Sequence, residues 1–229
     1  MLSTLATRRQ VIEMAIANVV SLCACLSALS AEQTGDDPIE WDAFIEELAE
    51  LSKSYSQSDG KERNYVKHLS QLLRSLKYSD SAIRKAIEGY QGNQTTEIVG
   101  IPVYRTLRFE IALFSFQEGQ HLPYHNHPSM TGVSLCLSGS IEIHNLDVVG
   151  RADESTLWLR SSARERISSG KISWLTSHIR NIHQLRARQD SKLLDVFTPP
   201  YDPVRIAETR WYEVERQPTG KNLYAAHLL

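Results

Sequence analysis

The spacing of apolar residues changes along the chain, and the change divides it into a helical part and a β part. From residue 41 to residue 92, apolar side chains recur at intervals of three and four, which is typical of amphipathic helices. The first stretch carries Trp41, Phe44, Ile45, Leu48 and Leu51. The second, which ends at Gly92, has Ser79 or Asp80 as its candidate N-cap. The apolar stripe is narrow, which favours docking on the core of the same domain over a separate interaction domain.

From Ile98 the apolar period becomes two, which predicts β-strands. One alternating run is predicted across Val103, Arg105, Leu107, Phe109, Ile111, Leu113 and Phe114. About 200 residues follow the N-terminal segment, and that length suffices for one barrel with a helical extension. The predicted architecture is therefore a mainly β barrel with helices before it.

Two histidines, His125 and His127, stand two positions apart between Gly119 and Gly139. Residues two apart on a strand project to the same face, so both side chains can point at one metal ion. An isolated H-x-H pair is a weak signal, and exposed loop histidines are the alternative. The framing glycines and a third histidine, His183, favour a metal site on one hairpin of the barrel.

The segment from Gly119 to Gly139 resembles the first conserved motif of the cupin superfamily. That motif consists of a glycine, five residues, H-x-H, usually a glutamate ligand, and a closing glycine. The glutamate position falls on Gly132, which cannot bind a metal. In lacking this glutamate, the segment resembles that of the thiol dioxygenases, whose iron is held by three histidines alone. The resemblance implies that His183 is the third ligand beside the H-x-H pair.

Three ordered blocks extend the likeness to the cysteamine dioxygenase and plant cysteine oxidase family: YHNHPSMT, NIHQLRA and LLDVFTPPYD. It covers about residues 98 to 215. It implies a cupin double-stranded β-helix, or jelly-roll barrel, that oxidises a thiol to a sulfinic acid with O2. The implied substrates are cysteamine, cysteine or an N-terminal cysteine, and the implied cofactor is Fe(2+). Three imidazoles with open positions suit Fe(II), although zinc, nickel and copper also accept them.

Asp195 and Tyr201 are the candidate catalytic residues. Asp195 lies in LLDVF, a predicted buried strand, where a carboxylate is costly unless it is paired. The matching aspartate of the plant oxidases has a role in the site. Tyr201, in PPYD, matches a tyrosine at the mouth of the family's site. The alternatives are an aspartate on the exposed strand face and a loop tyrosine packed on the two prolines.

Several other residues remain alternatives. His121, His144 and His178 would each be a ligand if the strand register differed. Arg105 or Arg108 would select a substrate carboxylate if it faced the pocket, and would otherwise face water. Two other functions also remain open. They are a metal-dependent cupin dioxygenase acting on a carbon substrate and a non-catalytic cupin that binds a metal or small molecule.

Some thiol dioxygenases carry a cysteine–tyrosine crosslink beside the iron. The corresponding positions of cysteamine dioxygenase fall on Thr209 and Trp211, so we expect no crosslinked cofactor. Cys136 alternates with Ser134 and Ser138, and a free cysteine is commonly a small buried hydrophobe. We predict a structural role for it.

The N-terminal segment, residues 1–31, carries Arg8, Arg9 and an apolar run that ends in small residues, which is typical of an export signal. TRRQVI resembles a twin-arginine signal, so we expect export to the bacterial periplasm. A lipoprotein anchor at Leu22–Cys25 and a cytoplasmic protein with an amphipathic N-terminal helix are the alternatives.

The predicted division is an export signal at 1–31, a linker and helical extension at 32–97, and the barrel at 98–229. The apolar run is shorter than the about 20 residues that span a membrane, so we expect no stable span after signal removal. The formal net charge of −2 indicates no nucleic-acid partner. The expected partners of this predicted monomer are a small aminothiol or an N-terminal cysteine peptide, and O2.

Overall fold

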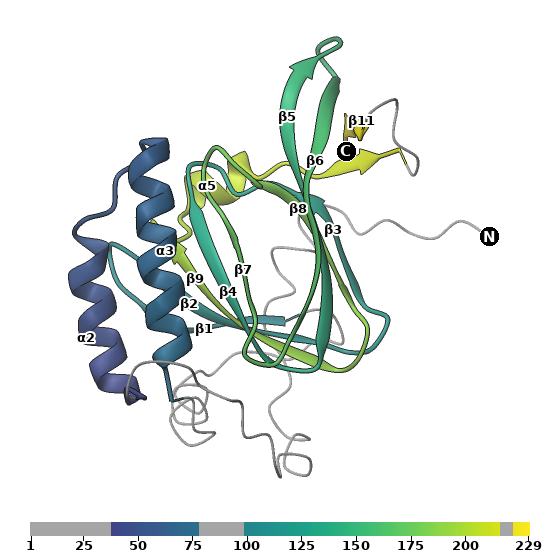
Figure 1. Cartoon of the computed structure of the whole chain (residues 1–229). Helices are drawn as coiled ribbons and strands as arrows, with labels where there is room; N and C mark the ends of the chain where they lie inside the picture. Colours follow the sequence, from purple (N-terminus) through teal and green to yellow (C-terminus); the bar gives the residue numbers. More distant parts are fainter. Residues whose placement is uncertain (1–37, 78–98, 216–221) are drawn as a thin grey trace.

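The computed structural model describes residues 38–77, 99–215 and 222–229 (Figure 1). The predicted export signal and the predicted second helix, from Asp80 to Gly92, lie outside these ranges, so both stay predictions. None of the helices within them is long and apolar enough to span a membrane.

Three helices are described. They are α2 (Trp41–Ser52), α3 (Asp59–Ser75) and α5 (Pro203–Glu208). Helix α2 confirms the first predicted helix, and its buried residues Phe44 and Leu48 lie four apart on one face. Helix α5 begins where Asp202 accepts a hydrogen bond from the backbone N–H of Arg205, with Pro203 at its first position.

The strands form two sheets. The five-stranded sheet has the order β1-β2-β9-β4-β7, and the six-stranded sheet has the order β10-β11-β6-β5-β8-β3. The bounds of the first sheet are β1 (Val99–Arg105), β2 (Glu110–Phe116), β9 (Ser191–Thr198), β4 (Thr131–Ser138) and β7 (Ile172–Leu175). Those of the second are β10 (Tyr212–Val214), β11 (Leu223–Leu228), β6 (Thr156–Ser168), β5 (Ser140–Arg151), β8 (Ile182–Ala187) and β3 (His121–His125). Neighbouring strands distant in sequence are typical of a jelly roll, and the predicted mainly β cupin fold is confirmed.

The first alternating run of the β part spans two strands. The alternating run from Val103 to Phe114 is interrupted between β1 and β2, and Leu107 in the turn is 98% exposed. The hydroxyl of Thr106 accepts hydrogen bonds from the backbone N–H groups of Arg108 and Phe109, at 3.1 Å each. Because a threonine can close such a turn without changing the apolar period, alternation alone could not locate the break.

The prediction that the histidine pair lies on one hairpin is wrong. Strand β3 pairs with β8 in one sheet, whereas β4 pairs with β7 and β9 in the other. His125 is the last residue of β3, and His127 lies beyond it in the connection that crosses between the sheets. Ser129 in this connection has a φ of 54°, a turn conformation that the two-residue period does not anticipate.

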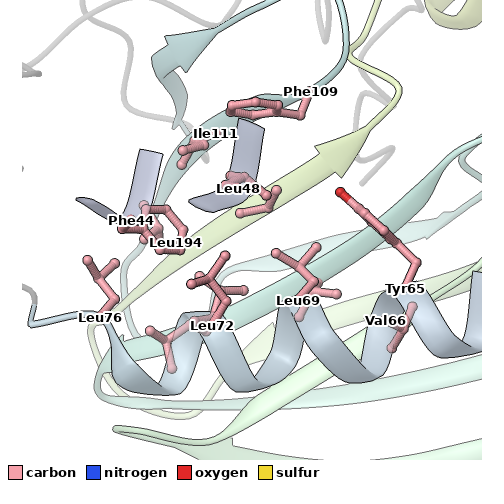
Figure 2. Close-up of a cluster of buried hydrophobic side chains, with 14 of the residues drawn as sticks. Phe44, Leu48, Tyr65, Val66, Leu69, Leu72, Leu76, Phe109, Ile111 and Leu194 are labelled. Atoms are coloured by element: carbon pink, nitrogen blue, oxygen red, sulfur yellow. The ribbon is translucent and has the colours of Figure 1, made fainter. Parts of the chain in front are cut away.

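The two long helices share a core with the barrel (Figure 2). Phe44 and Leu48 of α2, Leu69 and Leu73 of α3 and Leu194 of β9 are all fully buried in one cluster. Burial of each such side chain contributes about 1.5–3 kcal/mol. The helical extension therefore docks on the outer face of the five-stranded sheet, as its narrow apolar stripe predicts.

The opposite face of that sheet lines the barrel interior. Along β9, Leu194 packs against the helices, while Leu193 packs in a second cluster that also contains Cys136. Strand alternation then directs Asp195 and Phe197 inward as well. Burial raises the pKa of the Cys136 thiol to about 11, in keeping with a small core residue. Apolar side chains fill one end of the interior and leave the other to polar groups.

The glycines that frame the histidine motif are both required by the backbone. Gly119 has a φ of 82° and Gly139 a φ of 79°, a region that other residues rarely occupy. A Cβ at Gly139 would also lie 2.2 Å from the carbonyl oxygen of Asp190. The spacing of the motif thus reflects two turns around the strands that lead to the site.

Candidate metal centre

Three histidines from separate segments meet inside the barrel. His125 ends β3, His127 lies in the connection after it, and His183 is on β8. Nε2 of His183 lies 2.9 Å from Nε2 of His127 and 3.3 Å from Nε2 of His125. Each side chain offers a ring nitrogen to one point, and the three atoms lie within 4.8 Å of one another.

Burial keeps these imidazoles neutral. It lowers the pKa of His125 to about 4, although the carbonyl of Pro123 partly offsets this effect. The pKa values of His127 and His183 lie well below the usual range because of burial and the neighbouring histidines. Neutral imidazole is the form that binds metal ions.

Partners on the far nitrogens orient two of the three rings, those of His125 and His127. Nδ1 of His125 donates to the carbonyl oxygen of Pro123 at 2.8 Å, which leaves a lone pair on Nε2. Nδ1 of His127 lies 2.5 Å from the hydroxyl of Tyr201. Two nitrogens bound at about 2.1 Å and at right angles to one ion are about 3 Å apart. The observed Nε2 separations therefore fit one metal ion bound on a face of three ligands.

Two aromatic rings pack against the clustered histidines. Phe197 stacks on His127 with ring centroids 5.2 Å apart and an interplanar angle of 18°. Trp211 lies against His125 at 4.8 Å and 31°, next to an isolated β-bridge between these two residues. Neither ring was predicted as part of the site. Trp211 does occupy the position matched to the crosslinked tyrosine of cysteamine dioxygenase. That match could have indicated from the sequence that Trp211 lies near the site.

The PCO_ADO family profile matches residues 64–227, which is most of the chain. This chain belongs to the PCO_ADO family of cupin thiol dioxygenases. The match begins within α3 and so extends further toward the N-terminus than the three sequence blocks.

Curated relatives of this PCO_ADO protein include animal proteins named as dioxygenases and a plant protein named as a cysteine oxidase. The 2-aminoethanethiol dioxygenase of Mus musculus is 27% identical over 189 residues, which cover 70% of this chain and 73% of the relative. The Homo sapiens protein of the same name is 28% identical over 173 residues and 64% of each chain. Plant cysteine oxidase 2 of Arabidopsis thaliana is 26% identical over 148 residues, 60% of this chain and 53% of the relative. The chain thus spans between about half and three quarters of their length.

Packing at Gly132 leaves no room for the glutamate that the general cupin motif usually carries at this position. Gly132 lies on β4 opposite Phe197 of β9. A Cβ at Gly132 would lie 3.0 Å from Cε1 of the Phe197 ring. The ring that stacks on His127 thus fills the space that a longer side chain at position 132 would need.

Two buried carboxylates share the interior with Tyr201. Asp195 is 6% exposed, and its Oδ1 has no hydrogen-bond partner among the described residues. Burial raises the pKa of Asp195 to about 7, with a smaller opposing effect of Ser134. Burial also raises the pKa of Glu110, although Arg105 opposes it. The pKa of Tyr201 is raised by burial first and then by Asp195 and Glu110, so its hydroxyl stays protonated.

Glu110 was not predicted as a site residue. The sequence feature that could have identified it is a carboxylate within the apolar run FEIALF, at one of the alternate positions of β2 that face the barrel interior. Asp195 lies on the buried face of its strand, so the alternative of an exposed aspartate is wrong. Tyr201 contacts Phe197 and His127, and its contacts are therefore not limited to neighbouring prolines.

The alternative ligands lie elsewhere. Nδ1 of His144 is 2.6 Å from the hydroxyl of Tyr124, and its Nε2 is 2.9 Å from that of Ser161. His178 is largely exposed and bonds the carbonyl of Gln57, and His121 is exposed at the start of β3. The three-histidine cluster found in the described part of the chain contains none of them.

The two candidate arginines differ in their surroundings. Arg105 is half exposed, lies 3.3 Å from Glu110 and donates to the carbonyl oxygen of Tyr201. Arg108 is exposed in the turn between β1 and β2.

Proposed function

We propose that this PCO_ADO protein is an iron-dependent dioxygenase that adds both atoms of O2 to the sulfur of an amine-bearing thiol. The reaction converts one thiol and one O2 into one sulfinic acid, R–SH + O2 → R–SO2H, so no other reductant is required. The single observation that supports it most is the convergence of three neutral Nε2 atoms without a carboxylate among them.

His125, His127 and His183 would hold the iron through Nε2. Three neutral ligands on one face suit Fe(II) with open positions. When bound, the iron would supply the chemistry that joins thiol sulfur and O2, and a shared site would make their reaction effectively intramolecular. The names of the curated relatives support thiol oxidation as the reaction class.

The buried carboxylates favour a substrate with an amine. Oδ1 of Asp195 is an acceptor without a donor among the described residues, and a substrate ammonium group would satisfy it. Glu110 adds a second acidic group on the same interior. Arg105 is already engaged by Glu110 and the carbonyl of Tyr201, so it is a poor partner for a substrate carboxylate. We therefore propose cysteamine or a peptide with an N-terminal cysteine as the substrate class.

Tyr201 would orient His127 and face the substrate. Its oxygen would accept the Nδ1–H of His127, which leaves the Nε2 lone pair for the metal. Because the pKa of Tyr201 is raised, the hydroxyl keeps its own proton and can donate it to the substrate.

Oxygen uptake by the anaerobically Fe(II)-loaded chain tests this proposal. The thiols to compare are cysteamine, a Cys-initiated peptide, cysteine and 3-mercaptopropionate. We expect uptake with the first two, much slower uptake with 3-mercaptopropionate, and none with His183→Ala. Failure of every thiol despite stoichiometric iron would instead indicate a carbon-substrate cupin or a binding protein.

A further inference from the structure

We propose that Glu62, on helix α3 of the helical extension, is a positioning residue for the histidine site. The inference rests on the proposed metal site and gives the helices a part in it. Glu62 lies two residues before the segment matched by the family profile, and its side chain is fully buried.

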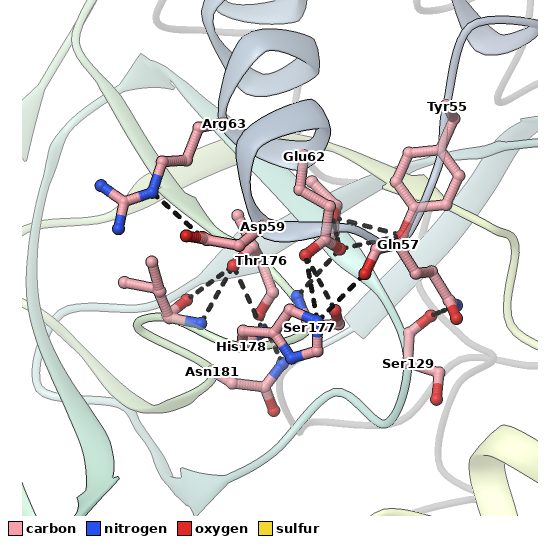
Figure 3. Close-up of polar contacts among 12 residues, drawn as sticks. Tyr55, Gln57, Asp59, Glu62, Arg63, Ser129, Thr176, Ser177, His178 and Asn181 are labelled. Carbon is pink, nitrogen blue, oxygen red and sulfur yellow. Dashed lines mark hydrogen bonds and ion pairs between the residues drawn. The ribbon is translucent and has the colours of Figure 1, made fainter.

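The carboxylate of Glu62 accepts hydrogen bonds from donors on separate segments of the chain, among them Tyr55 and Ser177 (Figure 3). Its Oε1 accepts from the hydroxyls of Thr131 and Tyr55, at 2.8 and 3.1 Å, and from the backbone N–H of Ser177 at 3.2 Å. Its Oε2 accepts from the hydroxyl of Ser177 at 2.9 Å. A buried carboxylate is costly unless it is bonded in this way. Glu62 therefore ties the start of β4 to the loop before β8.

That loop holds the backbone of a histidine ligand. Nδ2 of Asn181 donates to the carbonyl oxygens of Thr176 and His127, at 2.8 and 3.0 Å. Oδ1 of Asn181 accepts from the backbone N–H of His127 at 3.0 Å. Both backbone groups of His127 are thus fixed by a residue two positions before His183. A shift of Ser177 would move Thr176 and Asn181, and with them the relative position of the two histidines.

The helical pair makes further contacts with the same segments. Nε2 of Gln57 donates to the carbonyl oxygen of Ser129, and the carbonyl of Gln57 accepts from His178, at 2.9 and 3.0 Å. The hydroxyls of Tyr65 and Thr198 are hydrogen-bonded at 2.8 Å, three residues before Tyr201. The helices therefore contact the chain beside each group of site residues, and Glu62 makes the most bonds among these contacts.

Cobalt(II) binding to the metal-free full chain tests this role, with chelator competition for affinity and the visible spectrum for ligand geometry. We expect Glu62→Ala to raise the dissociation constant about 10–100-fold, as the loss of groups that orient ligands typically does. Glu62→Gln keeps an acceptor oxygen and should recover part of the affinity. Leu73→Ala is the matched control: it removes a fully buried side chain of the same helix that packs in the apolar cluster. It should lower unfolding stability and leave the affinity within about twofold, since it removes no hydrogen bond to the loops.

Ser177→Ala removes only the hydroxyl donor and tests the same link if Glu62→Ala does not fold. We expect it to weaken cobalt binding severalfold. Wild-type affinity and spectrum in the Glu62 and Ser177 variants would overturn the inference, as would equal weakening by Leu73→Ala. No thiol is present in this assay. Tight cobalt binding by a chain whose Fe(II)-loaded form oxidises no thiol in the separate oxygen-uptake assay would therefore overturn the proposed function alone. A wild-type chain that binds no cobalt would overturn both.

Discussion

The hydroxyl of Tyr201 lies 2.5 Å from Nδ1 of His127. This contact joins the segment after β9 to the connection between the two sheets. It also leaves Nε2 of His127 facing Nε2 of His183. A tyrosine that sequence comparison placed at the mouth of the site thus also orients one of the three clustered histidines.

Tyr201→Phe should weaken metal binding and slow turnover. The phenylalanine keeps the ring contact with Phe197 but leaves Nδ1 of His127 without its partner, so the imidazole can rotate or change tautomer. We expect a loss of about 10–100-fold in metal affinity or activity. Chelator competition and steady-state rates measure both effects. Tyr224→Phe, in a separate apolar cluster, is the control and should change neither.

His183→Ala should abolish metal retention, whereas His178→Ala should leave it unchanged. The first change removes one of three converging nitrogens, and the second removes a largely exposed side chain that bonds the carbonyl of Gln57. Metal content after gel filtration distinguishes the two. The reverse pattern would show that the register of the ligands is different.

Asp195→Asn should stabilise the metal-free protein at high pH. The pKa of Asp195 is raised from 3.8 to about 7, so between these values the folded state holds more protons than the unfolded state. Stability from this group is present below pH 4 and is lost as the pH rises through 7. The asparagine removes a penalty of roughly 4 kcal/mol at most. Urea unfolding at pH 8 and pH 5 should show a larger gain at pH 8, and a gain independent of pH would refute the assignment.

Gly132→Glu should destabilise the fold and not complete a four-ligand site. The new side chain meets the Phe197 ring, which would have to leave its stacking position on His127. We expect a cost of about 1–3 kcal/mol in urea unfolding, together with weaker metal binding. In the double variant with Phe197→Ala, the Phe197 ring is absent, so part of the space that the new glutamate needs should become available. Full stability of the single variant would mean that packing does not exclude a side chain there.

Local sequence patterns were sufficient to predict part of this structure. The three-residue and four-residue spacing around Phe44 and Leu48 predicts α2 because a docked helix buries one face. The glycines at 119 and 139 identify two turns because both adopt positive φ. The pair His125 and His127 is prominent in the sequence, although the reason given for its convergence, a shared strand face, does not apply to this connection.

The remaining features depend on contacts between distant segments. Asn181 fixes His127 from 54 positions away, and Glu62 bonds Ser177 across 115 positions. The spacing of apolar residues along the sequence does not reveal such pairings. Phe197 has the ordinary apolar pattern of a core strand, yet its ring excludes a side chain at Gly132. These roles become visible only when the two sheets and the helices are assembled.

The most direct test of the proposed function uses oxygen-18 gas with cysteamine and the Fe(II)-loaded chain, followed by mass spectrometry of the product. We expect a sulfinic acid in which both added oxygen atoms carry the label, and no such product from His183→Ala. A product with one labelled atom, or a disulfide with no added oxygen, would contradict thiol dioxygenation by this site.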